Sequence, residues 1–492
     1  MDSIISSINS IIWSPALIYL CLGVGLFYSL STKFLQVRHF GEMWRLLRDG
    51  KQSDHGISSF QALAVSLSGR VGTGNIAGVA AAIGFGGPGA VFWMWVVAFL
   101  GASTAYVEST LGQIYKEDFE GSYRGGPAYY IEKVLGMKWY SLVFALSTVL
   151  ACGILLPTVQ SNSIGTAVAQ AFGNGAEINS FFGVLSSSKI YAAFGITIML
   201  SFIVFGGLKR IANFTQIVVP FMALTYIVIA IIILVLNLDK IPGIFSLIVG
   251  DAFSPMAGVG AAIGWGVKRG VYSNEAGQGT GPHAAAAAEV EHPAQQGLVQ
   301  AFSVYIDTLF VCSATAFMIL IMGTYNVQGE AGSFLVQNVS PDTIINSPAF
   351  TQMAVDSVFS GFGEVFVAVA LFFFAFTTLL AYYFIAEVNL AYLRKHFRFP
   401  INDTILKVVL VSAAFYGTIK EAGLAWGMGD IGVGLMAWLN IIAILIIFFK
   451  GKPALIALKD YEYQLKTSGT GKFSFDPKKL GIKGASFWEK RK

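Results

Sequence analysis

The sequence predicts an all-α integral membrane protein with eleven membrane-crossing helices. Hydrophobic residues make up 55% of the 492 residues and charged residues only 12%, whereas about 25% of the residues in a soluble protein are charged. The mean hydropathy is +0.66. Long runs without Asp, Glu, Lys or Arg recur along the chain, and each can cross a hydrocarbon layer of roughly 30 Å as a helix.

Turn residues and charges bound each crossing. The expected crossings are residues 15–32, 58–83, 89–114, 138–171, 188–207, 213–237, 254–286, 297–323, 362–394, 403–420 and 429–449. The tenth has a short uncharged part, so Lys407 has to reach toward an interface. The chain therefore divides into a first helix with an amphipathic cytoplasmic loop (1–57), two five-helix repeats (58–238 and 239–449) and a basic cytoplasmic tail (450–492).

The distribution of basic residues predicts the orientation. If the loop after the first crossing is cytoplasmic, most of the 32 Lys and Arg residues lie on that side, and the outer loops hold only Lys189, Lys240 and Lys420. This asymmetry is typical of the positive-inside rule. We therefore expect the N-terminus outside and the basic tail inside, where the tail contacts anionic lipid. A nucleic-acid partner is not expected, because no zinc spacing or binding motif accompanies the tail.

A glycine-rich stretch, SGRVGTGNIAG (residues 68–78), interrupts the second crossing. Gly72, Gly74 and Ala77 fit the G-x-G-x-x-A spacing of a nucleotide-binding loop, but apolar helical sequence flanks them where that fingerprint needs a soluble βαβ unit. Non-helical backbone at membrane depth persists only where protein or water satisfies its polar groups. The stretch therefore predicts a broken helix beside a cavity.

A second interruption, GWGVKRGVYSNEAGQGTGPHAAAAAE (residues 264–289), lies in the seventh crossing. Crossings 2–6 and 7–11 then form two halves with inverted topology, and paired interrupted helices are typical of a transporter's binding site. Close packing of small residues is the alternative. The charges of Arg70, Lys268, Arg269 and Glu275 argue against it, because charged residues inside a crossing are usually functional.

The first break predicts two kinds of ligand. Its second half begins near Thr73 with free amide groups at a positive helix end, which suits a carboxylate. The carbonyl groups released around Ser68 and Val71 suit a small cation such as Na⁺. One break would thus hold an amino acid and a cation side by side.

Further polar residues lie within the crossings. Gln160 is a candidate for binding a substrate amino group, with hydrogen bonding between helices equally open. Asp307 and Glu387 are buried acids for which an ion pair is the alternative, and Arg70 is a candidate partner of Glu275 or Asp307. Glu108, near the cytoplasmic end, is expected to reach water.

Other classes of protein fit the sequence less well. The five histidines lie in loops or at helix ends, and no HExxH motif or carboxylate pair is present, which argues against an enzyme. The three cysteines lie in apolar runs as packing residues. A channel or an amino-acid-gated receptor is the remaining alternative. No feature of the sequence defines an oligomeric state.

Three motifs resemble those of the sodium:alanine (alanine or glycine:cation) symporter family. They are GGPGAVFWMWVVAFLG (residues 86–101), SGRVGTGNIAGVA (68–80) and GVKRGVYSNEAGQGT (266–280). The resemblance covers nearly the whole chain. It implies the leucine-transporter-like fold of the amino acid/polyamine/organocation superfamily, with one extra helix before two inverted five-helix repeats whose helices 2 and 7 are broken. It also implies uptake of alanine, glycine or another small neutral amino acid across a prokaryotic inner membrane, driven by Na⁺ or, alternatively, by H⁺.

The resemblance also implies roles for individual residues. The VGTGN segment is similar to the VGLGN break of bacterial leucine transporters, and this similarity assigns the substrate carboxylate to Thr73 and Gly74. Asn75 could meet either the substrate or Na⁺. The family resemblance adds Gln160, Tyr272, Ser273, Asn274, Thr378 and Tyr382 to the substrate site. The same comparison assigns Na⁺ to Ser68, Val71, Thr377 and Thr378. Tyr382 departs from the family, which often has a tryptophan there to close the pocket over a small side chain. Glutamine or serine is therefore an alternative substrate.

The orientation can be tested with a reporter. An enzyme reporter that is active only in the cytoplasm, fused after Lys492, is expected to be active in cells, because the tail carries 11 of the basic residues. The same reporter fused after a truncation in the loop around Lys240 is expected to be inactive. The reverse pattern would contradict the predicted topology.

Overall fold

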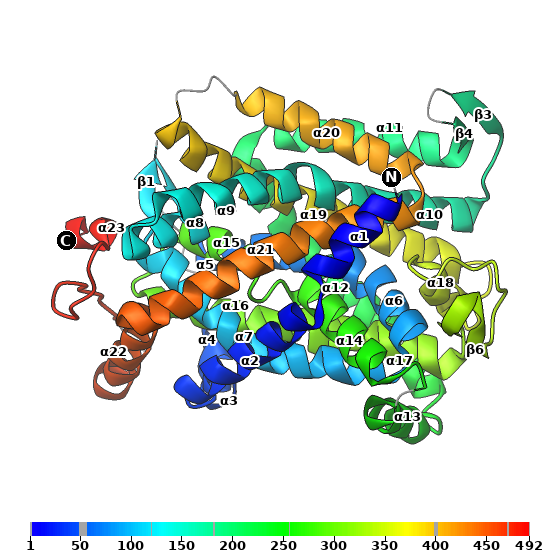
Figure 1. The fold of residues 1–492 in the computed structure, drawn as a ribbon, viewed down its shortest axis with the longest axis horizontal. Coiled ribbons are helices and arrows are strands. Elements are labelled where there is room, and N and C mark those ends of the chain that lie inside the picture. Colours follow the sequence, from blue (N-terminus) through cyan, green and yellow to red (C-terminus); the bar gives the residue numbers. More distant parts are fainter. Residues whose placement is uncertain are drawn as a thin grey trace.

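Helices that run side by side make up most of the molecule (Figure 1). The structure, a computed structural model, describes residues 2–48, 57–119, 121–180, 183–254, 256–397, 402–469 and 472–491. Among these residues, eight helical segments are long and apolar enough to cross a membrane. They are Ser3–Ser31, Gly89–Ile114, Lys138–Phe172, Ser187–Val204, Gly207–Leu236, Pro293–Met322, Gly363–His396 and Ala422–Gly451.

Most of these segments are single helices, and three are composite. The single ones are α7 (Gly89–Ile114), α11 (Ser187–Val204), α12 (Gly207–Leu236), α19 (Gly363–His396) and α21 (Ala422–Gly451). The composite ones are α1 and α2 (Asp2–Ile12, Pro15–Ser31), α9 and α10 (Lys138–Leu150, Leu156–Phe172), and α16 and α17 (Pro293–Val304, Ser313–Met322). Wider π-helical turns, Ala151–Leu155 and Tyr305–Cys312, join the last two pairs, and such turns are frequent at functional sites.

Two further helices are interrupted at the predicted glycine-rich stretches. The first consists of α5 (Ser59–Arg70), a 3₁₀ turn (Thr73–Asn75) and α6 (Ala77–Gly86). The second consists of α14 (Val259–Asn274) and α15 (Gly281–Ala287). The 17-residue α20 (Asp403–Ile419) occupies the predicted tenth crossing. Every expected crossing thus contains helix, and for 89–114 the bounds coincide.

Shorter elements gather at the two ends of the helices (Figure 1). One end has α3 (Leu35–Arg38), α4 (Phe40–Arg48), β1–β2 (Glu117–Phe119, Ser122–Arg124), α8 (Pro127–Tyr130), α22 (Pro453–Ser468) and α23 (Ser486–Lys490). The other end has β3–β4 (Glu177–Ser180, Gly183–Ser186), α13 (Ile241–Phe253), β5–β6 (Asn326–Gln328, Phe334–Gln337) and α18 (Ala349–Asp356). Each strand pair is an antiparallel hairpin. No sequence signal distinguished α13, which is apolar but has only 13 residues.

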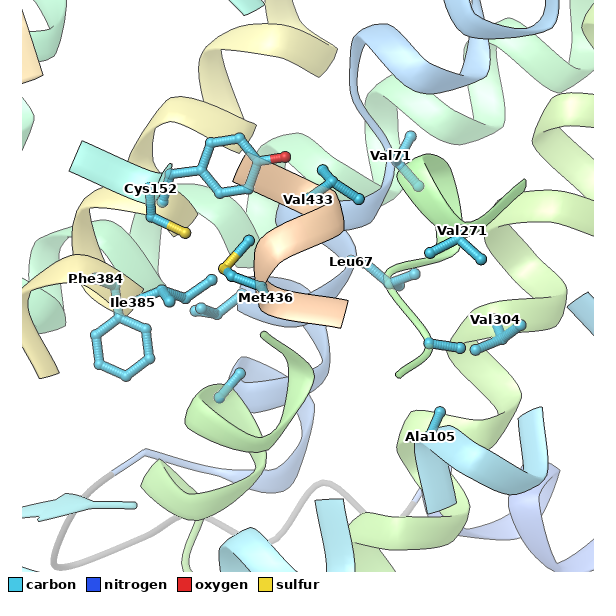
Figure 2. Close-up of a cluster of buried hydrophobic side chains, with 14 of the residues drawn as sticks. Leu67, Val71, Ala105, Cys152, Val271, Val304, Phe384, Ile385, Val433 and Met436 are labelled. Carbon is cyan, nitrogen blue, oxygen red and sulfur yellow. The ribbon is translucent and has the colours of Figure 1, made fainter. Parts of the chain in front are cut away.

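The two interrupted helices lie against the centre of the bundle. α7 packs on α14, α15, α16 and α2, and α19 packs on α5 and α10. In Figure 2, Leu67 and Val71 of the first interrupted helix lie near Val271 of the second, with Val433 and Met436 of α21 close by. All five side chains are buried. These apolar side chains belong to the core of the molecule, beside the two breaks.

Candidate functional site

The first break begins where α5 ends at Arg70. Val71 and Gly72 have non-helical backbone angles (φ −76°, ψ 86° and φ −140°, ψ −150°), and one 3₁₀ turn separates them from α6. Val71 is fully buried. The helix therefore stops and restarts inside the protein, where its released polar groups need partners.

Side chains supply acceptors for the amides of this break. The Gly72 N–H donates to Asn75 Oδ1 at 2.8 Å. The Thr73 N–H donates to Gln160 Oε1, from α10, at 3.0 Å. Gln160 thus lies at the first break, where its side-chain carbonyl oxygen holds the backbone.

The second break is held by a carboxylate. Glu275, Gly277 and Gly279 all have positive φ (58°, 86° and 81°), which turns the chain between α14 and α15. The N–H groups of Gly277 and Gly279 donate to the two oxygens of Glu108 on α7, at 3.2 and 3.1 Å. Asn440 Nδ2 donates to Glu108 Oε2 at 2.6 Å. The expectation that Glu108 reaches water is wrong, because its side chain is completely buried beneath this loop.

The two breaks touch each other. A side chain added at Gly74 would place its Cβ 3.1 Å from the Cα of Ser273 and 3.2 Å from Cδ1 of Tyr272. One added at Gly69 would lie 3.2 Å from Oε2 of Glu275. A Cβ at either position would be tighter than ordinary van der Waals contact, and at Gly74 the neighbour is backbone of the other interrupted helix. Residues of two distant sequence motifs therefore lie in contact.

Asp307 links the breaks chemically. Its Oδ1 accepts hydrogen bonds from Asn75 Nδ2 at 2.6 Å and from Ser273 Oγ at 3.0 Å. Its Oδ2 accepts one from Thr308 Oγ1 at 2.7 Å. One buried carboxylate on the π-helical turn of the eighth crossing thus joins a residue of each interrupted helix.

The two threonines of α19 take different positions. Thr378 Oγ1 donates to the carbonyl oxygen of Ser68 at 2.7 Å, at the end of α5. Thr377 Oγ1 donates to the carbonyl oxygen of Phe374 at 3.0 Å and lies 3.9 Å from Met222 Sδ. The structure therefore brings Thr378 to the first break, whereas the hydroxyl of Thr377 contacts its own helix and α12.

Arg70 does not pair directly with the predicted acids. Its Nη1 donates to the carbonyl oxygen of Gln300 at 2.9 Å and to Ser303 Oγ. Within the described part of the chain, no ion pair joins Arg70 to Glu275 or Asp307. The arginine is thus held by α16.

Several polar atoms at the breaks have no hydrogen-bond partner among the described residues. They are Arg70 Nε and Nη2, Thr73 Oγ1, Tyr272 OH, Asn274 Nδ2 and Glu275 Oε1, all buried. Buried polar atoms in proteins are usually hydrogen-bonded, so each exception calls for an explanation such as a water molecule or an ion. Tyr382, also predicted for the site, is 2% exposed.

A cluster of charged side chains lies beside Tyr272 and includes Lys268 and Arg269 of the same helix, α14. Arg269 forms a bidentate ion pair with Asp430 of α21 (2.8 and 3.1 Å), and Lys268 Nζ lies 2.6 Å from the same carboxylate. The Arg269 guanidinium also lies 4.4 Å from the ring centre of Trp426. These contacts account for the predicted charges at 268 and 269 as a buried ion-pair network.

Two other polar residues have structural partners. Asn162 Nδ2 donates to the carbonyl oxygens of Gly417 and Lys420, at 3.0 and 2.6 Å, which is hydrogen bonding between helices. Glu387 pairs with Arg124 at 2.6 Å, so the ion-pair alternative is confirmed for this acid.

Known proteins are similar to this chain along its length. The profile of the sodium:alanine symporter family matches residues 1–475. YrbD of Bacillus subtilis (strain 168) is 56% identical over 100% of this chain and 98% of its own length. The sodium/proton-dependent alanine carrier protein of Bacillus sp. (strain PS3) is 49% identical over 91% of this chain and 97% of its own. The crystal structure of MhsT in complex with L-phenylalanine matches with a TM-score of 0.55 at 15% identity, over 82% of this chain and 100% of MhsT. This last similarity gives the fold, that of the leucine transporters, and nothing more.

Proposed function

The chain belongs to the sodium:alanine symporter family, and from this premise we propose that it carries alanine or glycine into the cell together with Na⁺ by alternating access. Cation-coupled symport of a small amino acid, and a class other than enzyme, follow from the family itself. The meeting of the two interrupted helices at Gly74, among unpartnered polar atoms, carries the assignment of the site.

The proposed transporter has eleven crossings. They are the eight long segments, the two interrupted helices and α20. The first crossing precedes two inverted repeats of five, and the protein lies in a prokaryotic inner membrane with its N-terminus outside. The clustering of α3, α4, α22 and α23 at one end supports this arrangement, because these are the segments expected in the cytoplasm (Figure 1).

The substrate carboxylate is proposed to bind at Thr73 and Gly74. The 3₁₀ turn and α6 begin here, so the positive end of a helix points at the break. The Thr73 N–H would have to exchange its acceptor Gln160 for the carboxylate. The unpartnered hydroxyl of Thr73 and the unpartnered groups of Tyr272 and Asn274 surround the same junction. Asn75 and Ser273 lie at its edge, where they are bonded to Asp307.

One proposed cation site lies at the end of α5. The carbonyl groups of Ser68 and Val71 and the hydroxyl groups of Thr377 and Thr378 would supply oxygen ligands, which small hard cations prefer. The 2.7 Å contact between Thr378 Oγ1 and the Ser68 carbonyl supports this pairing of α5 with α19. Thr377 would have to turn away from its own helix to join.

A second proposed cation site centres on Asp307. Its carboxylate and the hydroxyl oxygens of Ser273 and Thr308 form an oxygen cluster that contains a negative charge. The amide nitrogen of Asn75 donates to the same carboxylate. The cluster would hold Na⁺ or a proton. Glu275, whose Oε1 is unpartnered, is the alternative proton carrier. Burying an acidic side chain inside a membrane costs free energy, so an acid at this depth is a functional residue by default.

The side chain of the substrate is proposed to be small. The relative from Bacillus sp. (strain PS3) is named an alanine carrier. Tyr382 is buried beside the site and, being smaller and more polar than tryptophan, leaves glutamine or serine as alternatives.

The transport activity can be tested in proteoliposomes. Labelled alanine is expected to accumulate above its equilibrium level when a Na⁺ gradient is imposed at constant pH, and a panel of labelled amino acids in the same assay measures the preference. A pH gradient imposed alone separates H⁺ coupling from Na⁺ coupling. A channel would only equilibrate the amino acid. Uptake that ignores both gradients would contradict the proposal.

Gly74→Val is expected to abolish uptake while the protein still inserts. A valine side chain would collide with the backbone of Ser273, from which even its Cβ would be only 3.1 Å away, and would cover the amide groups. Gly195→Val, on α11, is the matched control, because no atom lies within 4 Å of the added Cβ there. Wild-type uptake by Gly74→Val would rule out the amide site.

Asp307→Asn is expected to raise the Na⁺ concentration for half-maximal uptake by about tenfold or more, because the variant removes the charge from the oxygen cluster while keeping its size. Uptake is measured against Na⁺ at fixed alanine. Asp342→Asn, at an exposed position outside the helices, is the matched control. If Asp307→Asn keeps the wild-type Na⁺ and pH dependence, the second cation site is wrong.

A further inference from the structure

The C-terminal segment, residues 472–491, packs on the body of the protein. Five of its apolar side chains are at most 8% exposed; they are Phe473, Phe475, Ile482, Ala485 and Trp488. Its basic side chains, such as Lys478, Lys479 and Lys490, are exposed. The segment was expected to contact lipid, but its apolar half is instead occupied by contacts within the protein.

Lys116, just after α7, is the anchor of the segment. Its Nζ lies 4.3 Å from the ring centre of Tyr123, 4.7 Å from that of Phe487 and 5.6 Å from that of Trp488. The Trp488 indole N–H also donates to the carbonyl oxygen of Gln113 at 2.8 Å. Two of the three rings around this fully buried lysine thus come from the C-terminal segment.

The segment also holds the linker that follows α15, residues 288–292. The Phe473 N–H donates to Glu291 Oε2 at 3.0 Å, and Arg491 Nη1 donates to the carbonyl oxygen of Val290 at 2.5 Å. Lys116 Nζ donates to the carbonyl oxygen of Ala288 at 2.7 Å. Lys116 and the linker 288–292 are therefore both bonded to the C-terminal segment or to each other.

The linker connects both interrupted helices. The Ile57 N–H donates to the carbonyl oxygen of Ala287 at 3.2 Å, and the Glu289 N–H donates to that of Ile57 at 3.0 Å. Ile57 lies just before α5, and Ala287 is the last residue of α15. The inner ends of α5 and α15 thus meet where the C-terminal segment is seated.

The second break can act as a hinge for this end. α15 has only seven residues, and the connection between α14 and α15 contains three residues with positive φ. A short helix attached through such a turn can change direction without disturbing α14, once its outer contacts and the hydrogen bonds of Gly277 and Gly279 to Glu108 are released. The contacts of the linker with the C-terminal segment are among those outer contacts.

We propose that residues 472–491 form an intramolecular clamp, which holds α15 and the linker 288–292 against the end of α7 and has to release before the pathway opens on that side. The proposal rests on the alternating access and the cytoplasmic tail of the proposed function. Seating the clamp removes Lys116 from water. Burial lowers the pKa of the Lys116 amine, whereas the aromatic faces favour its charged form, so the two effects oppose each other.

The clamp can be tested by hydrogen exchange of the full-length protein in lipid nanodiscs. Trp488→Ala removes one of the three aromatic rings around Lys116 and the hydrogen bond to the Gln113 carbonyl oxygen. We expect amide exchange in residues 281–292 to become about tenfold faster. Tyr463→Ala is the matched control, because this tyrosine of α22 is 67% exposed, and it should exchange like the wild type.

Each outcome decides the proposal. Faster exchange of 472–491 with unchanged exchange of 281–292 would overturn the clamp, because the segment would then leave without releasing α15. If Trp488→Ala leaves 472–491 protected, a chain truncated after Gly469 replaces it, and wild-type exchange of 281–292 in that chain would also overturn the clamp. Alanine uptake by the same samples is read separately, so that failure of uptake by the wild type rejects the proposed function and not the clamp.

Discussion

Backbone groups that two glycine-rich breaks release at membrane depth must find partners inside the protein, because lipid offers none. Gln160 on α10 accepts from the first break and Glu108 on α7 accepts from the second. Neither residue lies on an interrupted helix, so a hydrogen bond connects each break to a neighbouring helix, α10 or α7. The arrangement of these four helices therefore depends on a few side-chain acceptors, and a movement of either break requires that these bonds be exchanged.

The two breaks are satisfied by different chemistry, and this difference separates their roles. The acceptor at the first break is a neutral amide, whereas the acceptor at the second is a carboxyl group that takes two backbone N–H groups and one side-chain amide. The amide groups of the second break already meet a negative charge, and Glu108 keeps that loop folded. At the first break a substrate carboxylate could replace the neutral acceptor Gln160, while the charge of Asp307 lies close by, bonded to Asn75.

The sequence was informative where the signal is local and silent where it depends on the fold. Apolar length and glycine clusters predicted both interruptions, because glycine and polar residues are both unfavourable inside an uninterrupted membrane helix. Glu108 could not be placed, since its position along α7 suggested water and only the tertiary structure sets the loop of Gly277 and Gly279 over it. Asp430 is likewise revealed only by its contact with Arg269, from a helix far away in the chain. The docking of Trp488 on Gln113 is also long-range, so the basic composition of the tail did not predict it.

The position of Asp307 gives a physical reason for coupling a cation to an amino acid. Asp307 is bonded to Asn75 and Ser273, and these two residues flank Gly74 at the junction of the breaks. A substrate carboxylate at Thr73 and Gly74 would therefore lie near a second carboxylate in a region closed to water, where two like charges repel strongly. A cation between them turns this repulsion into two attractions, so each ligand raises the affinity for the other. A proton on Asp307 would remove the repulsion as well, and this makes both Na⁺ and H⁺ chemically reasonable partners for one and the same site.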